Sequence, residues 1–294
     1  MRFEDFPAAA GEEPFRPVTP LLATPEARLE GAELKREAEA GPNFAGHFRL
    51  ALLDCGSCCR EVSLVDVRSG EVRWAFRAWC GEASPGRPAE RVGLDFRKES
   101  ALLVVQGAPE EAGRNRVLCF RWTGQRLELL RADDPAAGRG GFAVPASPWL
   151  LELSTAGLEL KKAQYRDDGG GYFVLAGGDV TISFFLDRER DCSSGRACRD
   201  RLWASREPKL KTARGVKRWE RGDLGLLAFE VAGPQEAGGV QRHLYAQYVC
   251  DGAWADIHLA ATGGASGAAP DSLLESLLES IAFPGKPAAP PARN

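Results

Sequence analysis

The sequence predicts an α+β protein of two domains: an N-terminal β-meander domain with one helix, and a C-terminal antiparallel sheet flanked by helices. The 294 residues are 44% hydrophobic, which is enough to build two ordinary cores. Apolar and polar residues alternate between glycine-containing turns over most of the chain, and only three segments show helical spacing. Residues 133–148 are rich in glycine and proline and divide this pattern in two, so we place a linker there.

The first domain is expected over residues 23–132, after an extended, proline-rich arm at residues 1–22. Its helix begins at Thr24-Pro25, because threonine is a good N-cap and proline is favoured at the first helical position. A Gly-Pro pair after residue 40 ends this helix. Alternating patterns and glycine turns then predict strands at residues 48–53, 61–67, 72–76, 102–106, 117–122 and 127–130.

The second domain is expected over residues 149–284, with a first helix at residues 197–207. Its closing helix begins at the capping box of Ser272 and Glu275 and carries one leucine-rich stripe. Residues 285–294, rich in proline and alanine, are expected to form a disordered tail. Strands are predicted at residues 149–153, 158–160, 172–176, 180–186, 225–231, 240–250 and 253–260.

Charge and motifs exclude several classes of function. The net charge is −3 and neither half of the chain is basic, so we expect no nucleic-acid partner. No apolar run is long enough for a transmembrane helix. Hydrolase, zinc-protease and phosphate-loop motifs are absent, and three histidines offer few general bases. We therefore expect a non-catalytic protein without a cofactor.

The eight cysteines predict an oxidising compartment, either periplasmic or secreted. Residues 1–30 contain no signal peptide, so the alternatives are a processed exported protein or a cytoplasmic one. A disulfide is expected between Cys192 and Cys198, which flank a short polar loop that can bend back on itself. Further disulfides of open connectivity are expected among Cys55, Cys58, Cys59, Cys80 and Cys119.

The Cys55-x-x-Cys58 pair has two functional alternatives. With His47 and Cys80 it would supply four zinc ligands, although no second pair of this kind exists. A thioredoxin-like redox pair would need to begin a helix, whereas this pair follows a predicted strand. Structural disulfides are the favoured interpretation, and we expect no metal.

The Asp251-Gly252 turn predicts a tight hairpin whose register pairs Tyr245 with His258. Alternation then places one set of residues on the core side and a polar, aromatic set on the other. This second set is a candidate binding face, or a catalytic or metal-binding one, and the alternative is an ordinary solvated sheet face. Its members are His243, Tyr245, Gln247, Trp254, Asp256 and His258.

One stretch, residues 188–221, contains twelve basic and five acidic residues in a chain of negative net charge. Such a stretch is either a solvated helix with its loops or a surface for an acidic partner. The partner would be a protein, an anionic lipid surface or a cell-wall polymer. The candidate contacts are Arg199, Arg206 and Lys211.

Two resemblances extend this prediction. The stretch Gly-Pro-Asn-Phe-Ala-Gly-His at residues 41–47, followed by Cys55-Gly-Ser-Cys58, resembles an uncharacterised group of bacterial secreted proteins that pairs GPNFAGH with GCGxxC. Asp54 stands where that group has its first glycine, and Cys59 is an additional neighbour. The likeness covers residues 40–131; it implies export and no particular activity.

The second half is similar to the PsbP/Mog1-like fold. The similarity rests on two hairpins, at residues 172–186 and 243–259, and on the closing Leu-Leu-x-Ser-Ile-x-Phe of residues 277–283. The resemblance implies an antiparallel sheet flanked by helices and a role in binding or assembly. The sequence thus predicts an exported, non-catalytic binding module that contacts an acidic partner, with a ligand-binding protein or enzyme as the alternative.

Overall fold

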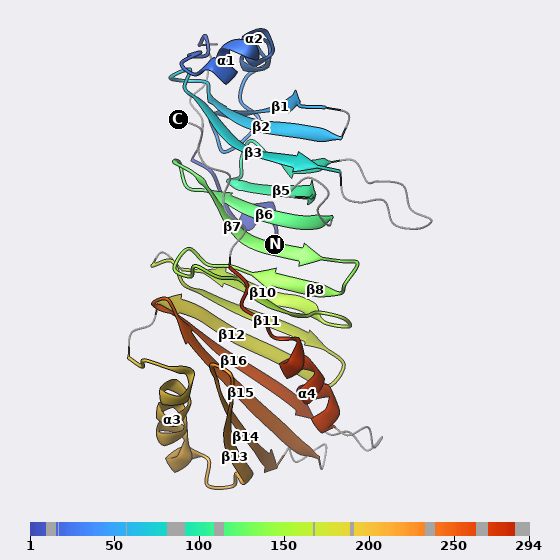
Figure 1. The fold of residues 1–294 in the computed structure, drawn as a ribbon, viewed down its shortest axis with the longest axis vertical. Helices are drawn as coiled ribbons and strands as arrows, with labels where there is room; N and C mark the ends of the chain where they lie inside the picture. The colour runs from blue at the N-terminus through green and yellow to red at the C-terminus, as the bar shows by residue number, and fades with distance from the viewer. Residues whose placement is uncertain are drawn as a thin grey trace. The chain divides into compact units, whose positions relative to one another are not determined.

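The computed structural model describes residues 1–9, 16, 18–56, 58–80, 92–108, 115–166, 168–188, 191–232, 239–262 and 270–285 (Figure 1). It consists mostly of antiparallel sheets with a few helices, which confirms the broad α+β prediction. The chain forms two compact units that divide between Ala137 and Gly138. No helix in the described part is both long and apolar enough to cross a membrane.

The helical region of the first unit consists of two short helices, α1 (Pro25–Leu29) and α2 (Gly31–Glu39). Thr24 caps α1 as predicted, because its side chain accepts a hydrogen bond of 3.2 Å from the N–H of Ala27. The predicted single helix is interrupted at Glu30, whose backbone leaves the helical conformation. Both helices bury apolar side chains against strands β1 (Phe48–Asp54) and β2 (Cys59–Asp66).

The sheets of the first unit are antiparallel throughout their described pairs. Strands β1, β2 and β3 form one sheet in sequence order, and β4 to β7 are likewise neighbours in sequence order. The sequence misses β4, which is only four residues long. The strands are β1 (Phe48–Asp54), β2 (Cys59–Asp66), β3 (Val72–Trp79), β4 (Gly93–Phe96), β5 (Leu102–Gly107), β6 (Arg116–Trp122) and β7 (Leu127–Asp134).

The described part of the expected extended arm at residues 1–22 is hydrogen-bonded to the rest of the first unit. It begins with a short 3-10 helix, η1 (Phe3–Asp5). The N–H of Ala8 then donates to the carbonyl of Glu99, and the N–H of Ala101 donates to the carbonyl of Phe6. These backbone bonds make the segment part of the fold.

The predicted linker at residues 133–148 is also part of the fold. Strand β8 (Arg139–Phe142) pairs with β9 (Leu151–Ser154), and Phe142 and Val144 are fully buried. The glycines and prolines in this stretch suggested a flexible connection. However, two large apolar side chains between them bury their surface in the core of the second unit.

The second unit is built on a seven-stranded antiparallel sheet in the order β10-β11-β12-β16-β15-β14-β13. The connection from β12 to β13 carries α3 (Gly195–Arg206) and the 3-10 helix η2 (Glu207–Lys209). The strands are β10 (Glu159–Tyr165), β11 (Gly171–Gly177), β12 (Val180–Arg188), β13 (Arg214–Arg221), β14 (Leu224–Ala232), β15 (Val240–Cys250) and β16 (Ala253–Thr262).

Helices cover both faces of this sheet (Figure 1). On one face, helix α4 (Pro270–Ser280) buries Leu274, Leu277 and Leu278 in the main core. On the other face, α3 packs Trp203 against strands β14 and β15. The described chain ends at Gly285, whose backbone bridges Trp149, and the rest of the predicted tail lies outside the described residues.

Two glycines bring the start of α3 directly onto the sheet. A Cβ at Gly195 would overlap the carbonyl oxygens of Asp223 and Gln247, and a Cβ at Gly225 would overlap the carbonyl of Gly195. Helix and strand backbones therefore touch at this point without side chains between them. This close approach fixes the height of α3 above β14 and β15.

We expect Gly195→Ala and Gly225→Ala each to lower the free energy of unfolding by about 1–3 kcal/mol or more, because the added methyl group forces the helix off the sheet. Urea denaturation followed by circular dichroism and tryptophan fluorescence measures the loss. Gly285→Ala is the matched control, since a Cβ there meets no atom. Equal stability of all three variants would show that α3 does not rest on the strands.

Candidate functional site

A strip of polar and aromatic side chains runs along β15 and β16 in the second unit. The predicted hairpin register is confirmed: Tyr245 is opposite His258, and Gln247 is opposite Asp256. The turn at Asp251-Gly252 has positive φ at both residues, as this kind of hairpin requires. The strip therefore contains all six predicted side chains on one face of the sheet.

The strip is not a solvated sheet face, because helix α3 covers it. Tyr245 and Gln247 are buried, and Trp254, Asp256, His243 and His258 are each only partly exposed. The sequence suggested a wet surface since the residues are polar. The helix that closes over them arrives from a distant connection between β12 and β13.

The two histidines lie inside a row of stacked rings. Nδ1 of His243 lies 2.8 Å from Nε2 of His258, so one ring donates to the other. Phe229 stacks on His243 at 5.1 Å between ring centroids, and Tyr245 stacks on His258 at 4.2 Å. Burial lowers the pKa of His258 to about 3, helped by the neighbouring imidazole and by Arg206. Burial likewise lowers the pKa of His243.

These histidines are poorly suited to acid–base catalysis. A general base works best with a pKa near the working pH, and His258 lies far below that range. Its Nε2 atom is already engaged by the other histidine. The pair is better explained as a satisfied part of the packing under α3.

Two of the three predicted surface cations instead make contacts within the second unit. Arg206 at the end of α3 donates to the hydroxyl of Tyr245 at 2.8 Å and stacks over its ring. Arg199 is 5% exposed and donates to the carbonyl of Trp219 at 2.8 Å, so it ties α3 to β13. Only Lys211 of the three predicted contacts is exposed.

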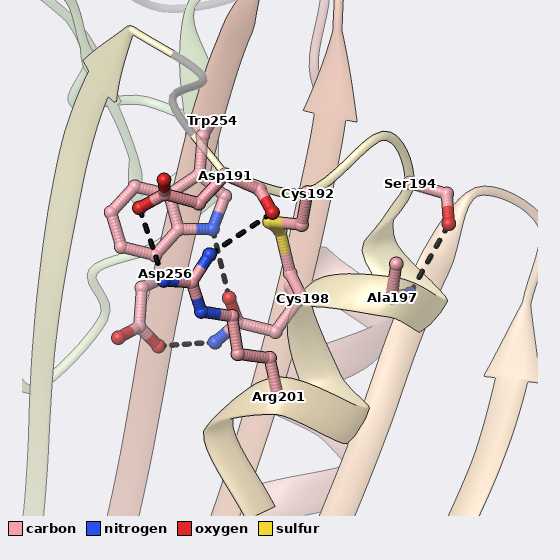
Figure 2. The surroundings of a disulfide bond; sticks show 9 residues. Asp191, Cys192, Ser194, Ala197, Cys198, Arg201, Trp254 and Asp256 are labelled. Atoms are coloured by element: carbon pink, nitrogen blue, oxygen red, sulfur yellow. Dashed lines mark hydrogen bonds and ion pairs between the residues drawn. A yellow bond between two sulfur atoms is a disulfide. The ribbon is translucent and has the colours of Figure 1, made fainter. Parts of the chain in front are cut away.

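A second polar group lies at the opposite end of the strip. The indole N–H of Trp254 donates to Oε1 of Gln247 at 2.8 Å, and the Gln247 amide then donates to Oδ1 of Asp256 at 2.5 Å (Figure 2). The indole thus fixes the orientation of the amide. Burial raises the pKa of Asp256, while the hydrogen bond from Gln247 opposes this shift.

A disulfide joins Cys192 to Cys198 across the start of α3, with 5.3 Å between their Cα atoms (Figure 2). It fastens the incoming loop to the first turn of the helix. Ser194 caps the same turn, since its side chain accepts from the N–H of Ala197 at 3.2 Å. The start of α3 is thus held by a covalent bond, a cap and the backbone contact at Gly195.

The space between this helix start and the sheet is a cavity of about 290 Å³. Its helix side includes Cys198 and Arg201, and its strand side includes Gln247, Trp254 and Asp256. The sequence predicted the strand residues as a face. It missed the helix side, because no local signal shows where a helix lies above a sheet.

The C-terminal part of the basic stretch, strand β13, forms the edge of the sheet. All eight residues of β13 are exposed, and β13 is the last strand in the sheet order. The sequence did not predict this strand, because its charged residues lack the alternation of a half-buried strand. Its cations are Arg214, Lys217, Arg218 and Arg221.

The cysteine cluster of the first unit is structural. Cys55 bonds to Cys59 and Cys58 bonds to Cys80, so Cys55 and Cys58 do not form a redox pair with each other. Cys80 is therefore no zinc ligand. Among the described residues, no three His, Cys, Asp or Glu side chains are grouped to hold a metal.

The remaining two cysteines are free thiols. Cys119, a suggested disulfide partner, is buried, and Cys250 is partly exposed. Burial raises the pKa of Cys119 to about 11, so its thiolate is scarce. The three disulfides as a set are compatible with a location outside the cytoplasm.

The GPNFAGH stretch acts as a structural connector into β1. The side-chain amide of Asn43 donates to the carbonyl of Leu50 and accepts from its N–H, at 3.2 and 2.7 Å. Phe44 is fully buried. The ring of His47 packs at a tilt against Phe48, 4.4 Å between centroids, and burial lowers the pKa of His47. The stretch shows packing roles and no assembled site.

Comparisons with known proteins give no identification. No family model matches the sequence, and no curated protein or solved structure is significantly similar to it.

Alkylation followed by intact mass tests the cysteine pairing. Unfolded but unreduced protein should take up two alkyl groups, at Cys119 and Cys250, and reduction should raise the number to eight. In the folded protein Cys250 should react first, because Cys119 is buried with a pKa of about 11. Eight reactive thiols before reduction would contradict both the pairing and the expected compartment.

The low pKa of His258 predicts an acid-labile second unit. An unfolded histidine binds a proton near pH 6.5, whereas folded His258 stays neutral down to about pH 3, so stability falls as the pH decreases between these values. We expect the pH dependence of the unfolding free energy to be steeper in the wild type than in His258→Phe by up to about 1.4 kcal/mol per pH unit. Urea titrations from pH 7 to 4 measure both slopes; parallel slopes would contradict a buried, neutral His258.

Proposed function

We propose that this chain is a non-catalytic binding module, periplasmic or secreted, that contacts an acidic protein partner through the exposed strand β13. Three disulfides support the compartment, since such bonds persist in oxidising surroundings. We also propose that the second unit is PsbP/Mog1-like and that the first belongs with the GPNFAGH group of secreted proteins. The helices on both faces of the seven-stranded sheet support the first of these assignments.

The observation that carries the proposed contact is the exposure of β13 along its whole length at the edge of the sheet. An edge strand offers backbone N–H and C=O groups to an additional strand. Four cations against the single acid Glu220 favour an acidic segment over a neutral one. Exposed Val216 and Trp219 add apolar surface to the same strand.

The geometry changes the set of contact residues. Arg199 and Arg206 are engaged within the unit, so the contact set becomes Lys211, Arg214, Lys217 and Arg218, which are all exposed. Substitution of Arg199 or Arg206 would disturb α3 itself. The enzyme alternative is weaker, because the two histidines serve the packing under α3.

The test uses an acidic peptide of alternating glutamate and threonine, which favours an extended conformation. We expect it to bind the full-length protein, more weakly as salt rises, and to lose more than about tenfold in affinity to Lys217→Glu/Arg218→Glu. The matched control is Lys161→Glu/Lys162→Glu, which makes the same charge change at two exposed residues of β10, the strand at the opposite edge of the sheet.

Titration calorimetry at two salt concentrations gives these affinities. Equal losses in the two double variants would show a general charge effect and contradict the assignment to β13. No binding of the peptide at low salt would contradict the acidic partner.

A further inference from the structure

No residue of β13 lines the cavity beneath α3; its charged lining consists of three carboxylates and the guanidinium groups of Arg188 and Arg201. Asp187 is paired with the guanidinium of Arg166. Asp191 is paired with Arg201, which lies 3.3 Å from its carboxylate and 3.0 Å from its backbone carbonyl. The third carboxylate, Asp256, accepts a hydrogen bond from the neutral Gln247 amide.

Asp256 has no cationic partner among the described residues. The charge of Arg206 reaches it from a distance, but that guanidinium is held on Tyr245. One carboxylate oxygen faces the Gln247 amide and the other points away from it (Figure 2). A partly enclosed carboxylate without a counter-charge is costly unless a donor reaches it.

The residues around Asp256 hold the Gln247 amide and the helix side of the cavity in place. Gln247 cannot turn its amide, because Trp254 holds its oxygen at 2.8 Å. The disulfide of Cys192 and Cys198 forms part of the cavity wall and fixes the helix side. A rigid first layer of this kind is typical of sites that recognise one charged group.

We infer that the cavity binds a small organic cation, an ammonium or guanidinium compound, through Asp256, with its apolar part against Trp254. The volume of about 290 Å³ is at the lower end for ligand sites, so the ligand carries no more than one ring and a short chain. Trp254 supplies an aromatic surface, which attracts cations as well as apolar groups.

The test compares 2-phenylethylamine with its neutral counterpart 2-phenylethanol on the full-length protein, by ligand-observed NMR and calorimetry. We expect the amine to bind and the alcohol to bind about 10- to 100-fold more weakly, the loss that accompanies removal of a charge-assisted hydrogen bond. Asp256→Asn preserves the shape of the side chain and should lower the affinity for the amine to that for the alcohol.

Two further variants test whether the effect is specific to Asp256 and whether the ligand occupies the cavity. Asp251→Asn makes the same change on an exposed residue of the same hairpin and should leave amine binding intact. Ser205→Phe enlarges a residue that lines the cavity from the exposed side of α3 and should weaken both compounds without altering Asp256.

Three results would overturn the inference. Equal binding of amine and alcohol would show an apolar cavity without charge recognition. An equal loss in Asp256→Asn and Asp251→Asn would show a general attraction to a negatively charged protein. No binding of either compound would show that Asp256 needs no ligand cation, because water or its own proton satisfies it.

Discussion

The backbone contact between Gly195 and Gly225 determines how the second unit is organised. At this point α3 rests on β14 without side chains between them, and the Cys192–Cys198 disulfide fastens the loop before it. Because α3 lies this close to the sheet, it covers the polar strip and shields it from solvent. The stacked histidines, the low pKa of His258 and the cavity beside Asp256 all result from that enclosure.

The same helix separates the basic residues of the connection into two groups. Arg199 and Arg206 turn inward, one to the carbonyl of Trp219 and the other to the ring of Tyr245. The cations on β13 remain outside, on the edge of the sheet. The second unit thus has an enclosed carboxylate, which we propose for a small cation, and an open basic edge, which we propose for a larger acidic partner.

Local chemistry made much of the fold predictable. The Asp251-Gly252 turn defined the register of β15 and β16, and Thr24 marked the start of the first helix. Strand β13 was missed because charged side chains conceal an exposed strand. The fit of Gly195 on Gly225 was also missed, since it joins segments that are close only after folding. The cavity could not be predicted for the same reason, although the sequence placed its strand residues on one face of the sheet.

The enclosure of the polar strip is the central claim, and an NMR titration of the histidine rings tests it most directly. If α3 seals the strip, the His258 resonances should not titrate until the pH approaches 3, well below the ordinary histidine pKa of about 6.5. His243 should also titrate below its ordinary range, because it is buried in the same row of rings. Titration of His258 near pH 6.5 in the folded protein would show that the strip is open to water and would contradict the account.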